Sequence, residues 1–339
     1  MKSVLIEEPG KVKLIESVAP VPGNDEVLLK VKYIGLCGSD LSSYRGLSPL
    51  VRYPVIPGHE VSGVIVGKGA GVPDTFQTGD EVTVNPYSSC GKCPACRAGR
   101  VNTCEFNQTL GVQRNGALSE LFTINYQKLL KSSILTSREF SLVEPLSVGY
   151  HAANRGQVTE IDTVLIIGCG MIGIGAVLAC LRKGATVIAA DLDDKKLELV
   201  RSFGVKYTIN PAHTPVLKQV LEITGGEGAN VCIEAVGSAA TYTMAVEAAA
   251  FAGRVVYIGY AKNEVSFNTS LFVKKELTIS GSRNALFEFG PVIKMQDDRS
   301  VPTEKLITKV YPIEETGAAL ADWNANPGDF IKILVDVEK

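Results

Sequence analysis

The sequence predicts an α/β protein with two domains, a β-rich domain followed by a doubly wound parallel sheet. Its 339 residues exceed the roughly 150 residues of one domain. The pattern of apolar residues also changes near residue 150. Before it, short strands alternate with Gly and Pro, and after it, strands alternate with helices. A chain of this length can bury a core without disulfide bonds.

Composition excludes several classes of function. The formal net charge is −2, from 34 Lys and Arg against 36 Asp and Glu, so there is no basic surplus to favour nucleic acid. No apolar run approaches the roughly 20 residues of a membrane span, and residues 1–10 are too short for a signal peptide. We therefore expect a cytoplasmic protein with no nucleic-acid or membrane partner.

The first half reads as short strands separated by Gly and Pro. Strands are predicted at residues 27–34, 61–66 and 81–85. Intervals such as Gly67–Gly71 punctuate them, which is typical of a barrel-like or sandwich-like β unit.

The second half reads as strands alternating with helices. Strands are predicted at 163–167, 185–190, 231–236, 254–258 and 277–280, and helices at 171–183, 195–203 and about 241–251. This alternation is typical of parallel βαβ units in a doubly wound sheet. A last strand is predicted at 330–335.

Four cysteines form the strongest local motif: Cys90, Cys93, Cys96 and Cys104. Four thiolates at this spacing can surround one tetrahedral Zn²⁺ and fix a loop that has no core of its own. Ferredoxin-type runs have a shorter last interval, followed by a Pro that is absent here. Four unrelated buried cysteines are the alternative, but Gly91 and Pro94 indicate a loop. We expect a structural zinc lobe over about residues 88–106.

Gly168, Gly170 and Gly173 form a second motif between a predicted strand and a predicted helix, and Asp191 ends the next strand. In this context GxGxxG predicts a dinucleotide site. The first Gly allows the turn, the second admits the pyrophosphate and the third lets the helix lie close to the strand. Asp191 would accept hydrogen bonds from the ribose hydroxyls. A Gly-rich turn without a ligand is the alternative.

Cys37, His59 and Glu144 are a third, dispersed set. Thiolate, imidazole and carboxylate all bind zinc, and three ligands leave the open position of a catalytic site. Spacing alone cannot bring them together, however. The residue types by themselves favour a core Cys, a His that caps a strand and a surface Glu.

Several segments together resemble the zinc-dependent medium-chain dehydrogenases, which include alcohol and polyol dehydrogenases. In chain order they are GLCGSD at 35–40, GHE at 58–60, Gly79-Asp80-x-Val82, the four cysteines, Glu144-Pro145 and the glycine motif. The resemblance runs from end to end. It implies a GroES-like catalytic domain (residues 1–149 and 286–339) interrupted by a Rossmann nucleotide-binding domain (residues 150–285).

By this resemblance, Cys37, His59 and Glu144 hold a catalytic zinc, with Glu60 beside it as an exchanging ligand. Ser39 would accept the proton of the substrate alcohol, and hydride would pass to a nicotinamide held across the domain cleft. Many relatives have a His five residues after the Cys ligand, where this chain has a Ser at position 42, so the outer part of the proton path differs.

We expect NAD(H) rather than NADP(H) as the cofactor. Asp191 favours ribose hydroxyls, and Asp193 and Asp194 would repel a 2′-phosphate. The expected cofactor-binding residues are Gly168, Gly170, Met171, Ile172, Gly173, Asp191, Lys196, Val236 and Gly259.

The substrate is expected to be a polyol or sugar acid. Glu144-Pro145 resembles sorbitol and galactitol-phosphate dehydrogenases. The segments that resemble L-galactonate/L-gulonate 5-dehydrogenases are Cys90–Cys104, Leu110–Val112, Lys274–Glu276 and Gly281–Ala285. Arg283 is predicted to bind the carboxylate, with Arg45 and Arg52 as rivals. An L-threonine or polyol-phosphate dehydrogenase, or a non-catalytic nucleotide-binding relative, are the alternatives. The family suggests a homodimer or homotetramer.

The remaining His and Cys residues receive simpler interpretations. We expect His151 to pack a helix or lie near the cofactor, and His213 to be solvated. Cys169, Cys180 and Cys232 are predicted to be small core residues.

Overall fold

In the computed structural model, which describes residues 1–299 and 302–338, the chain divides into two compact units. Unit 1 consists of Met1–Glu144 and Phe289–Lys339, and unit 2 of Pro145–Glu288. Residues 300, 301 and 339, part of the predicted segment 286–339, lie outside the described residues. The first crossing falls inside helix α4 (Val143–Arg155), ahead of the predicted residue 149. A continuous helix gives no break in the sequence pattern to mark it.

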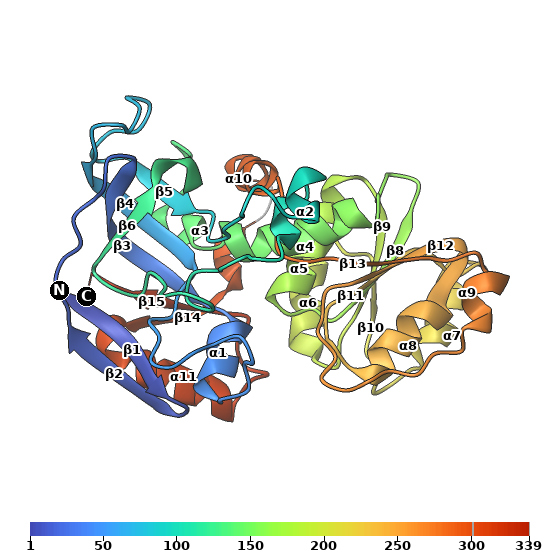
Figure 1. Ribbon diagram of the computed structural model, residues 1–339. Coiled ribbons are helices and arrows are strands. Elements are labelled where there is room, and N and C mark those ends of the chain that lie inside the picture. The colour runs from blue at the N-terminus through green and yellow to red at the C-terminus, as the bar shows by residue number, and fades with distance from the viewer. Residues whose placement is uncertain (300–301, 339) are drawn as a thin grey trace. The chain divides into compact units, whose positions relative to one another are not determined.

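Unit 1 is built on a sheet in the order β14-β15-β3-β4-β5-β7, with β6 paired to β3, and on a separate hairpin β1-β2 (Figure 1). Its strands are β1 (Lys2–Glu8), β2 (Lys11–Glu16), β3 (Glu26–Leu36), β4 (Glu60–Lys68), β5 (Glu81–Val84), β6 (Leu121–Asn125), β7 (Leu129–Lys131), β14 (Ile307–Pro312) and β15 (Lys332–Asp336). Its helices are α1 (Gly38–Tyr44), α2 (Pro94–Arg97), α3 (Ser137–Phe140), α10 (Phe289–Asp297) and α11 (Thr316–Ala325), and its 3₁₀ turns are Val101–Thr103, Tyr126–Lys128, Thr303–Leu306 and Ile313–Glu315. Because β15 pairs with β3, the C-terminal segment returns to this sheet.

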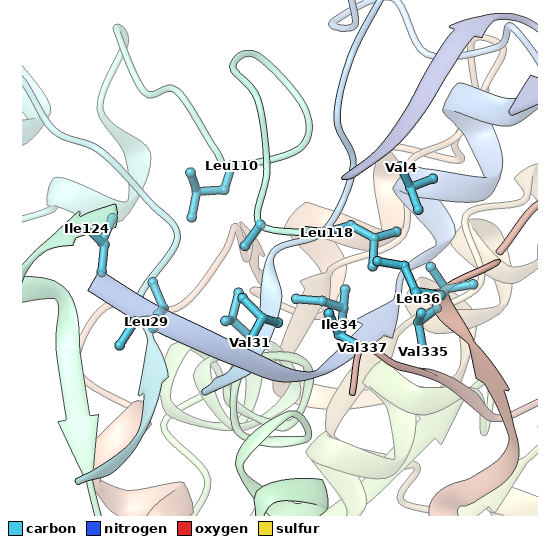
Figure 2. Packing of buried hydrophobic residues seen from close by; sticks show 14 of the residues in the cluster. Val4, Leu29, Val31, Ile34, Leu36, Leu110, Leu118, Ile124, Val335 and Val337 are labelled. Carbon is cyan, nitrogen blue, oxygen red and sulfur yellow. The ribbon is translucent and has the colours of Figure 1, made fainter. Parts of the chain in front are cut away.

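The core of unit 1 lies around β3. Val27, Leu29 and Val31 alternate toward the core and are buried, as the period of a half-buried strand requires. Figure 2 shows side chains of β3 beside Leu118, from a loop, and Val335, from β15. The predicted strands at 27–34, 61–66 and 81–85 correspond to β3, β4 and β5.

Unit 2 is a six-stranded sheet in the order β10-β9-β8-β11-β12-β13, with every pairing parallel. The strands are β8 (Thr163–Ile167), β9 (Thr186–Ala190), β10 (Tyr207–Ile209), β11 (Ala229–Glu234), β12 (Ala249–Tyr257) and β13 (Thr278–Gly281). The helices, besides α4, are α5 (Met171–Arg182), α6 (Asp194–Ser202), α7 (Val216–Ile223), α8 (Ala239–Ala248) and α9 (Ser270–Lys274). In Figure 1, α5 and α6 lie on one side of the sheet and α7 and α8 on the other. Strand order reverses between β8 and β11, which is where doubly wound sheets bind their ligands.

One predicted helix is too long. The helix expected over about 241–251 ends at Ala248, and β12 begins at Ala249, which pairs with Ala229. An alanine run has no hydrophobic period to mark where the helix ends, so the sheet ladder decides the boundary. No helix within the described ranges is long and apolar enough to cross a membrane.

Candidate functional site

Three metal-binding side chains meet in unit 1: Cys37, His59 and Glu60. One ligand atom of each lies within 4.8 Å of those of the other two. Cys37 follows β3 and His59 precedes β4, and these strands pair with Gly35 opposite Glu60. Gly35 leaves room for the carboxylate, because a Cβ there would lie 1.9 Å from Glu60 Oε2. The register of one antiparallel pair therefore assembles residues that are dispersed in the sequence.

Asp40 ties the two ligand segments together. Its Oδ2 accepts a hydrogen bond from the Cys37 N–H at 2.8 Å, and its Oδ1 accepts one from the Gly58 N–H at 3.4 Å. Gly58 directly precedes His59. Asp40 is fully buried and is not among the predicted site residues, although a carboxylate three residues after a turn residue is a capping signal.

The surroundings of His59 favour a bound cation. The residue is buried, and its Nδ1 has no hydrogen-bond partner among the described residues. Burial lowers the pKa of His59, but Cys37, Asp40 and Glu144 together raise it well above the usual value. Buried anionic groups need a compensating positive charge, and a sulfur, nitrogen and oxygen donor set suits Zn²⁺.

Glu60 is already paired with a lysine of β15. Both of its carboxylate oxygens lie 2.6 Å from Lys332 Nζ, which also donates to the Leu36 carbonyl at 2.9 Å. Burial lowers the pKa of Lys332, but Glu60 outweighs it and the pKa is raised. Glu60 can therefore bind a metal only by sharing its carboxylate with Lys332, a residue that sequence spacing could not connect to it.

Glu144, the predicted third ligand, lies outside the group of three within the described part of the chain. It is buried in the first turn of α4 and accepts a hydrogen bond from the Tyr87 hydroxyl. Burial raises the pKa of Glu144, and the charge of His59 opposes this. Glu144 therefore interacts electrostatically with the cluster. Tyr87, which orients it, is another residue that was not predicted.

Ser39 carries a hydroxyl that is ready to interact. It lies in the first turn of α1, and its Oγ is buried with no hydrogen-bond partner among residues 1–299 and 302–338. Ser42, in contrast, donates to the Gly38 carbonyl at 2.8 Å. Of these two hydroxyls near Cys37, only that of Ser39 therefore lacks a hydrogen-bond partner among the described residues.

The four cysteines of the predicted lobe form the second cluster, with sulfur atoms within 4.8 Å of one another. The apolar cluster of this lobe consists of the cysteines themselves and Ala95, so it has little core of its own. Backbone N–H groups of Cys96 and Glu105 lower the pKa of Cys93 to about 6, while burial raises that of Cys96 to about 11. Four sulfur donors in a closed set suit a structural Zn²⁺.

In unit 2, the glycine motif joins β8 to α5. Gly168 has φ +97°, and a Cβ on Gly173 would lie 1.8 Å from the Gly168 carbonyl oxygen, so both positions require Gly. A Cβ on Gly170, the N-cap of α5, would meet nothing within 4 Å. Open space at a helix N-terminus, where unpaired N–H groups point outward, suits a phosphate. Met171 and Ile172 are the first residues of the helix.

Asp191 follows β9 and braces the same turn. Its Oδ2 accepts from the Cys169 N–H at 2.6 Å and its Oδ1 from the Asp193 N–H at 2.9 Å. Each oxygen keeps a further lone pair, so a ribose hydroxyl can still donate to it. Lys196 Nζ lies 4.0 Å from Asp193 Oδ2.

Val236 and Gly259 follow the next two strands, β11 and β12. Val236 is 53% exposed, and a Cβ on Gly168 would lie 2.6 Å from its Cγ2. A Cβ on Gly259 would lie 2.3 Å from the Gly237 N atom. Buried Glu234 accepts from the Val236 and Gly237 N–H groups at 2.8 and 2.7 Å and was not predicted. The predicted cofactor residues thus gather at the carboxyl ends of the central strands.

The three candidate substrate arginines are divided between the two units. Arg45 is exposed, and its Nε donates to Asn324 Oδ1 at 2.6 Å. Arg52 is exposed in unit 1, and Arg283 belongs to unit 2.

The other His and Cys residues lie as follows. His151 is buried with Nδ1 2.9 Å from Glu288 Oε1, and the side chain of His213 is 70% exposed. The three cysteines predicted as core residues, Cys169, Cys180 and Cys232, are all buried.

Two protein-family models and several known proteins match the segments that carry these sites. Residues 23–134 match the alcohol dehydrogenase GroES-like domain, and residues 172–295 match the zinc-binding dehydrogenase family. An uncharacterized zinc-type alcohol dehydrogenase-like protein of Haemophilus influenzae is 35% identical over 334 residues, covering 98% of each chain. L-galactonate-5-dehydrogenase of Escherichia coli K12 is 32% identical over 313 residues, covering 92% of each. The crystal structure of E. coli RspB complexed with NADH superposes with a TM-score of 0.92 at 32% identity, covering 99% of each chain.

The chain therefore belongs to the zinc-type alcohol dehydrogenase family, with a GroES-like domain and a Rossmann domain. It is an oxidoreductase that acts on CH–OH donors. Both the resemblance drawn from the motifs and the predicted fold class are confirmed.

Proposed function

We propose that the protein oxidises a secondary alcohol of a polyol or sugar acid, of the L-galactonate or L-gulonate type, with NAD⁺. The observation that carries this is the cluster of half-buried Cys37 with buried His59 and Glu60, in a chain related to an L-galactonate dehydrogenase. The hydroxyl carbon gives up a hydride and the hydroxyl a proton. The products are a ketone, NADH and H⁺.

The catalytic zinc would be held by Cys37, His59 and Glu144, with Glu60 as an exchanging ligand. A zinc ion bound there supplies Lewis acidity, which lowers the pKa of a bound hydroxyl. Asp40 holds the Cys37 turn, Tyr87 orients Glu144, and Lys332 competes with the ion for Glu60. Ser39 Oγ accepts the substrate proton and releases its own toward solvent.

A second, structural zinc would be held by the four cysteines, Cys90, Cys93, Cys96 and Cys104. The four sulfur atoms within 4.8 Å of one another support this assignment, because they form a closed set of donors for one tetrahedral ion. We also propose a cytoplasmic location, where such thiols stay reduced.

The nicotinamide cofactor, which takes up the hydride, would bind at the glycine motif of unit 2. The Asp191 carboxylate accepts hydrogen bonds from the ribose hydroxyls, and Gly170 and the start of α5 face the pyrophosphate. The remaining residues of the site are Lys196, Val236 and Gly259. Asp193 and Asp194 would repel a 2′-phosphate. We expect kcat/KM to be much higher with NAD⁺ than with NADP⁺, and similar values with both cofactors would contradict the assignment.

For the assembly, we propose a homodimer or homotetramer. The exposed edge of β13 supports this, because unpaired strand edges favour association. Light scattering coupled to size-exclusion chromatography distinguishes these states from a monomer.

The substrate proposal is tested by a screen of L-galactonate, L-gulonate, galactitol, sorbitol, galactitol 1-phosphate and L-threonine with NAD⁺. We expect the aldonates to give the highest kcat/KM. A preference for L-threonine, or no turnover with any compound, would refute the sugar-acid assignment.

A further inference from the structure

Arg114 and Lys128 are two partly buried cations of unit 1. The Nε of Arg114 is buried without a hydrogen-bond partner, and no hydrogen bond or ion pair from another described residue reaches its guanidinium. Lys128 Nζ donates to the Tyr87 carbonyl at 2.7 Å, which is a neutral acceptor. Neither charge is therefore matched by a carboxylate of the described chain.

These two charges disfavour each other. Burial lowers the pKa of Arg114, and burial together with repulsion from Arg114 lowers the pKa of Lys128. Arg remains charged at any physiological pH, so the positive charge cannot be relieved by losing a proton. Partly buried like charges without a counter-ion cost free energy, and a bound anion would offset this cost.

The segment that carries Arg114 is fixed beside a proposed metal ligand. A Cβ on Gly111 would lie 2.6 Å from the Gly58 N atom, and one on Gly116 would lie 2.4 Å from the Gly58 carbonyl oxygen. The Ala117 N–H also donates to that oxygen at 2.9 Å. Since Gly58 precedes His59, the loop cannot move away without disturbing the cluster.

Lys128 is linked to the cluster from another direction. Its partner, Tyr87, donates its hydroxyl to Glu144. The Arg114 segment therefore contacts the residue that precedes His59, and Lys128 contacts the residue that donates to Glu144.

We infer that Arg114 and Lys128 form the subsite that binds the anionic group of the substrate, a carboxylate or a phosphate, while the hydroxyl to be oxidised lies at the Cys37–His59 cluster. This inference rests on the proposed function. It assigns recognition of the substrate's acidic group to residues of unit 1 instead of to Arg283 of unit 2. The Arg114 fork can donate two parallel hydrogen bonds to either anion, and Lys128 adds a point charge. Arg45, a rival, already donates to Asn324.

The kinetic test compares Arg114→Gln with wild type on L-galactonate, galactitol 1-phosphate and uncharged galactitol. A hydrogen bond to a charged group is worth about 1.5–3 kcal/mol, so kcat/KM for the preferred anion should fall roughly 10- to 100-fold, and Lys128→Gln should have a smaller effect. Galactitol should change less than about twofold. The anion whose kcat/KM falls identifies whether the site takes a carboxylate or a phosphate.

Two matched control variants make the same substitutions, Arg to Gln and Lys to Gln, at other positions of unit 1. Arg138→Gln removes a guanidinium that lies 5.6 Å from the Tyr33 ring centre, and Lys131→Gln removes an ammonium paired with Asp80 at 3.0 Å. Both should leave all three substrates unaffected. Arg283→Ala tests the alternative anion-binding residue. The inference would be overturned if Arg283→Ala selectively lost turnover of the anionic substrates and Arg114→Gln did not.

Binding to the zinc-loaded full-length protein, measured by calorimetry, does not depend on turnover. Wild type should bind at least one of the two anions, and Arg114→Gln should bind it roughly 10-fold or more weakly. If wild type binds neither anion, or if Arg114→Gln binds as well as wild type, the subsite is refuted. Anion binding that depends on Arg114 in a protein that oxidises none of the three compounds would refute the proposed function and leave the subsite standing.

Discussion

The two groups of metal-binding side chains in unit 1 are built in different ways. The four cysteines of the lobe lie within one loop and provide most of its buried cluster themselves. The cluster of Cys37, His59 and Glu60 instead lies at the ends of β3 and β4, strands held by a large apolar core. We therefore expect a metal to organise the chain at the lobe, and to bind an already ordered site at the ends of β3 and β4. The same ion would therefore support folding in one and chemistry in the other.

Removing a sulfur from the lobe should give the largest effect. In Cys93→Ser the lobe loses a ligand, and structural zinc contributes its binding free energy directly to folding. We expect the Tm to fall by roughly 10 °C, which corresponds to a loss of a few kcal/mol in the free energy of unfolding for a chain of this size. Aggregation of the protein is the other expected result. Cys180→Ala, a buried cysteine of unit 2, is the control and should lower the Tm far less. An equal fall in Tm in the two variants would mean that the lobe cysteines contribute no more to stability than an ordinary buried cysteine.

Removing a ligand from the dispersed cluster should abolish turnover but preserve the fold. Lewis-acid catalysis by a metal is worth several kcal/mol, so Cys37→Ser and His59→Ala should lower kcat about 1,000-fold or more. Circular dichroism and NADH binding should stay close to wild type, because the core around β3 and the whole of unit 2 are untouched. A variant that unfolds instead would show that this cluster is structural as well.

The ion pair of Glu60 and Lys332 should matter more to stability than either zinc-ligand change in the dispersed cluster. Lys332→Met leaves a buried carboxylate without its partner, which costs about 3 kcal/mol or more. Chemical denaturation measures the loss. The double variant Lys332→Met/Glu60→Gln should recover part of it, since no uncompensated charge remains. A single variant as stable as wild type would mean that Glu60 is not held by Lys332.

The smallest effect is expected at Tyr87, whose hydroxyl donates to Glu144. Partners that orient a ligand are worth about 10- to 100-fold in metal affinity. Tyr87→Phe should therefore weaken zinc binding at the dispersed site roughly 10-fold and leave the lobe unchanged, as measured by competition with a chelator. If both sites lose affinity together, the two would not be independent.

The same contrast explains what could be predicted from the sequence. The lobe and the glycine motif are local, so the spacing of their residues indicated them directly. Cys37 and His59 come together through the register of β3 and β4, and spacing cannot show a register. Family resemblance supplied those two residues but not the partners that hold the site.

Those missed partners share one cause. Asp40, from a helix turn, and Lys332, from the last strand, contact the cluster, and Tyr87, from a loop, contacts Glu144. Lys332 lies on β15, which the sequence predicted as a strand but could not pair with β3. The predicted end of the helix at Phe251 was wrong for a related reason, because pairing with a distant strand decides where that helix ends.

The most direct test of the account is the zinc content of three proteins, measured together with their Tm. Wild type should hold zinc at both clusters. Cys37→Ser should lose the metal of one cluster at an unchanged Tm, and Cys93→Ser should lose the other with a large drop in Tm. Fewer than two zinc ions in carefully prepared wild type, or a Tm that falls equally in both variants, would contradict the division into a folding site and a catalytic site.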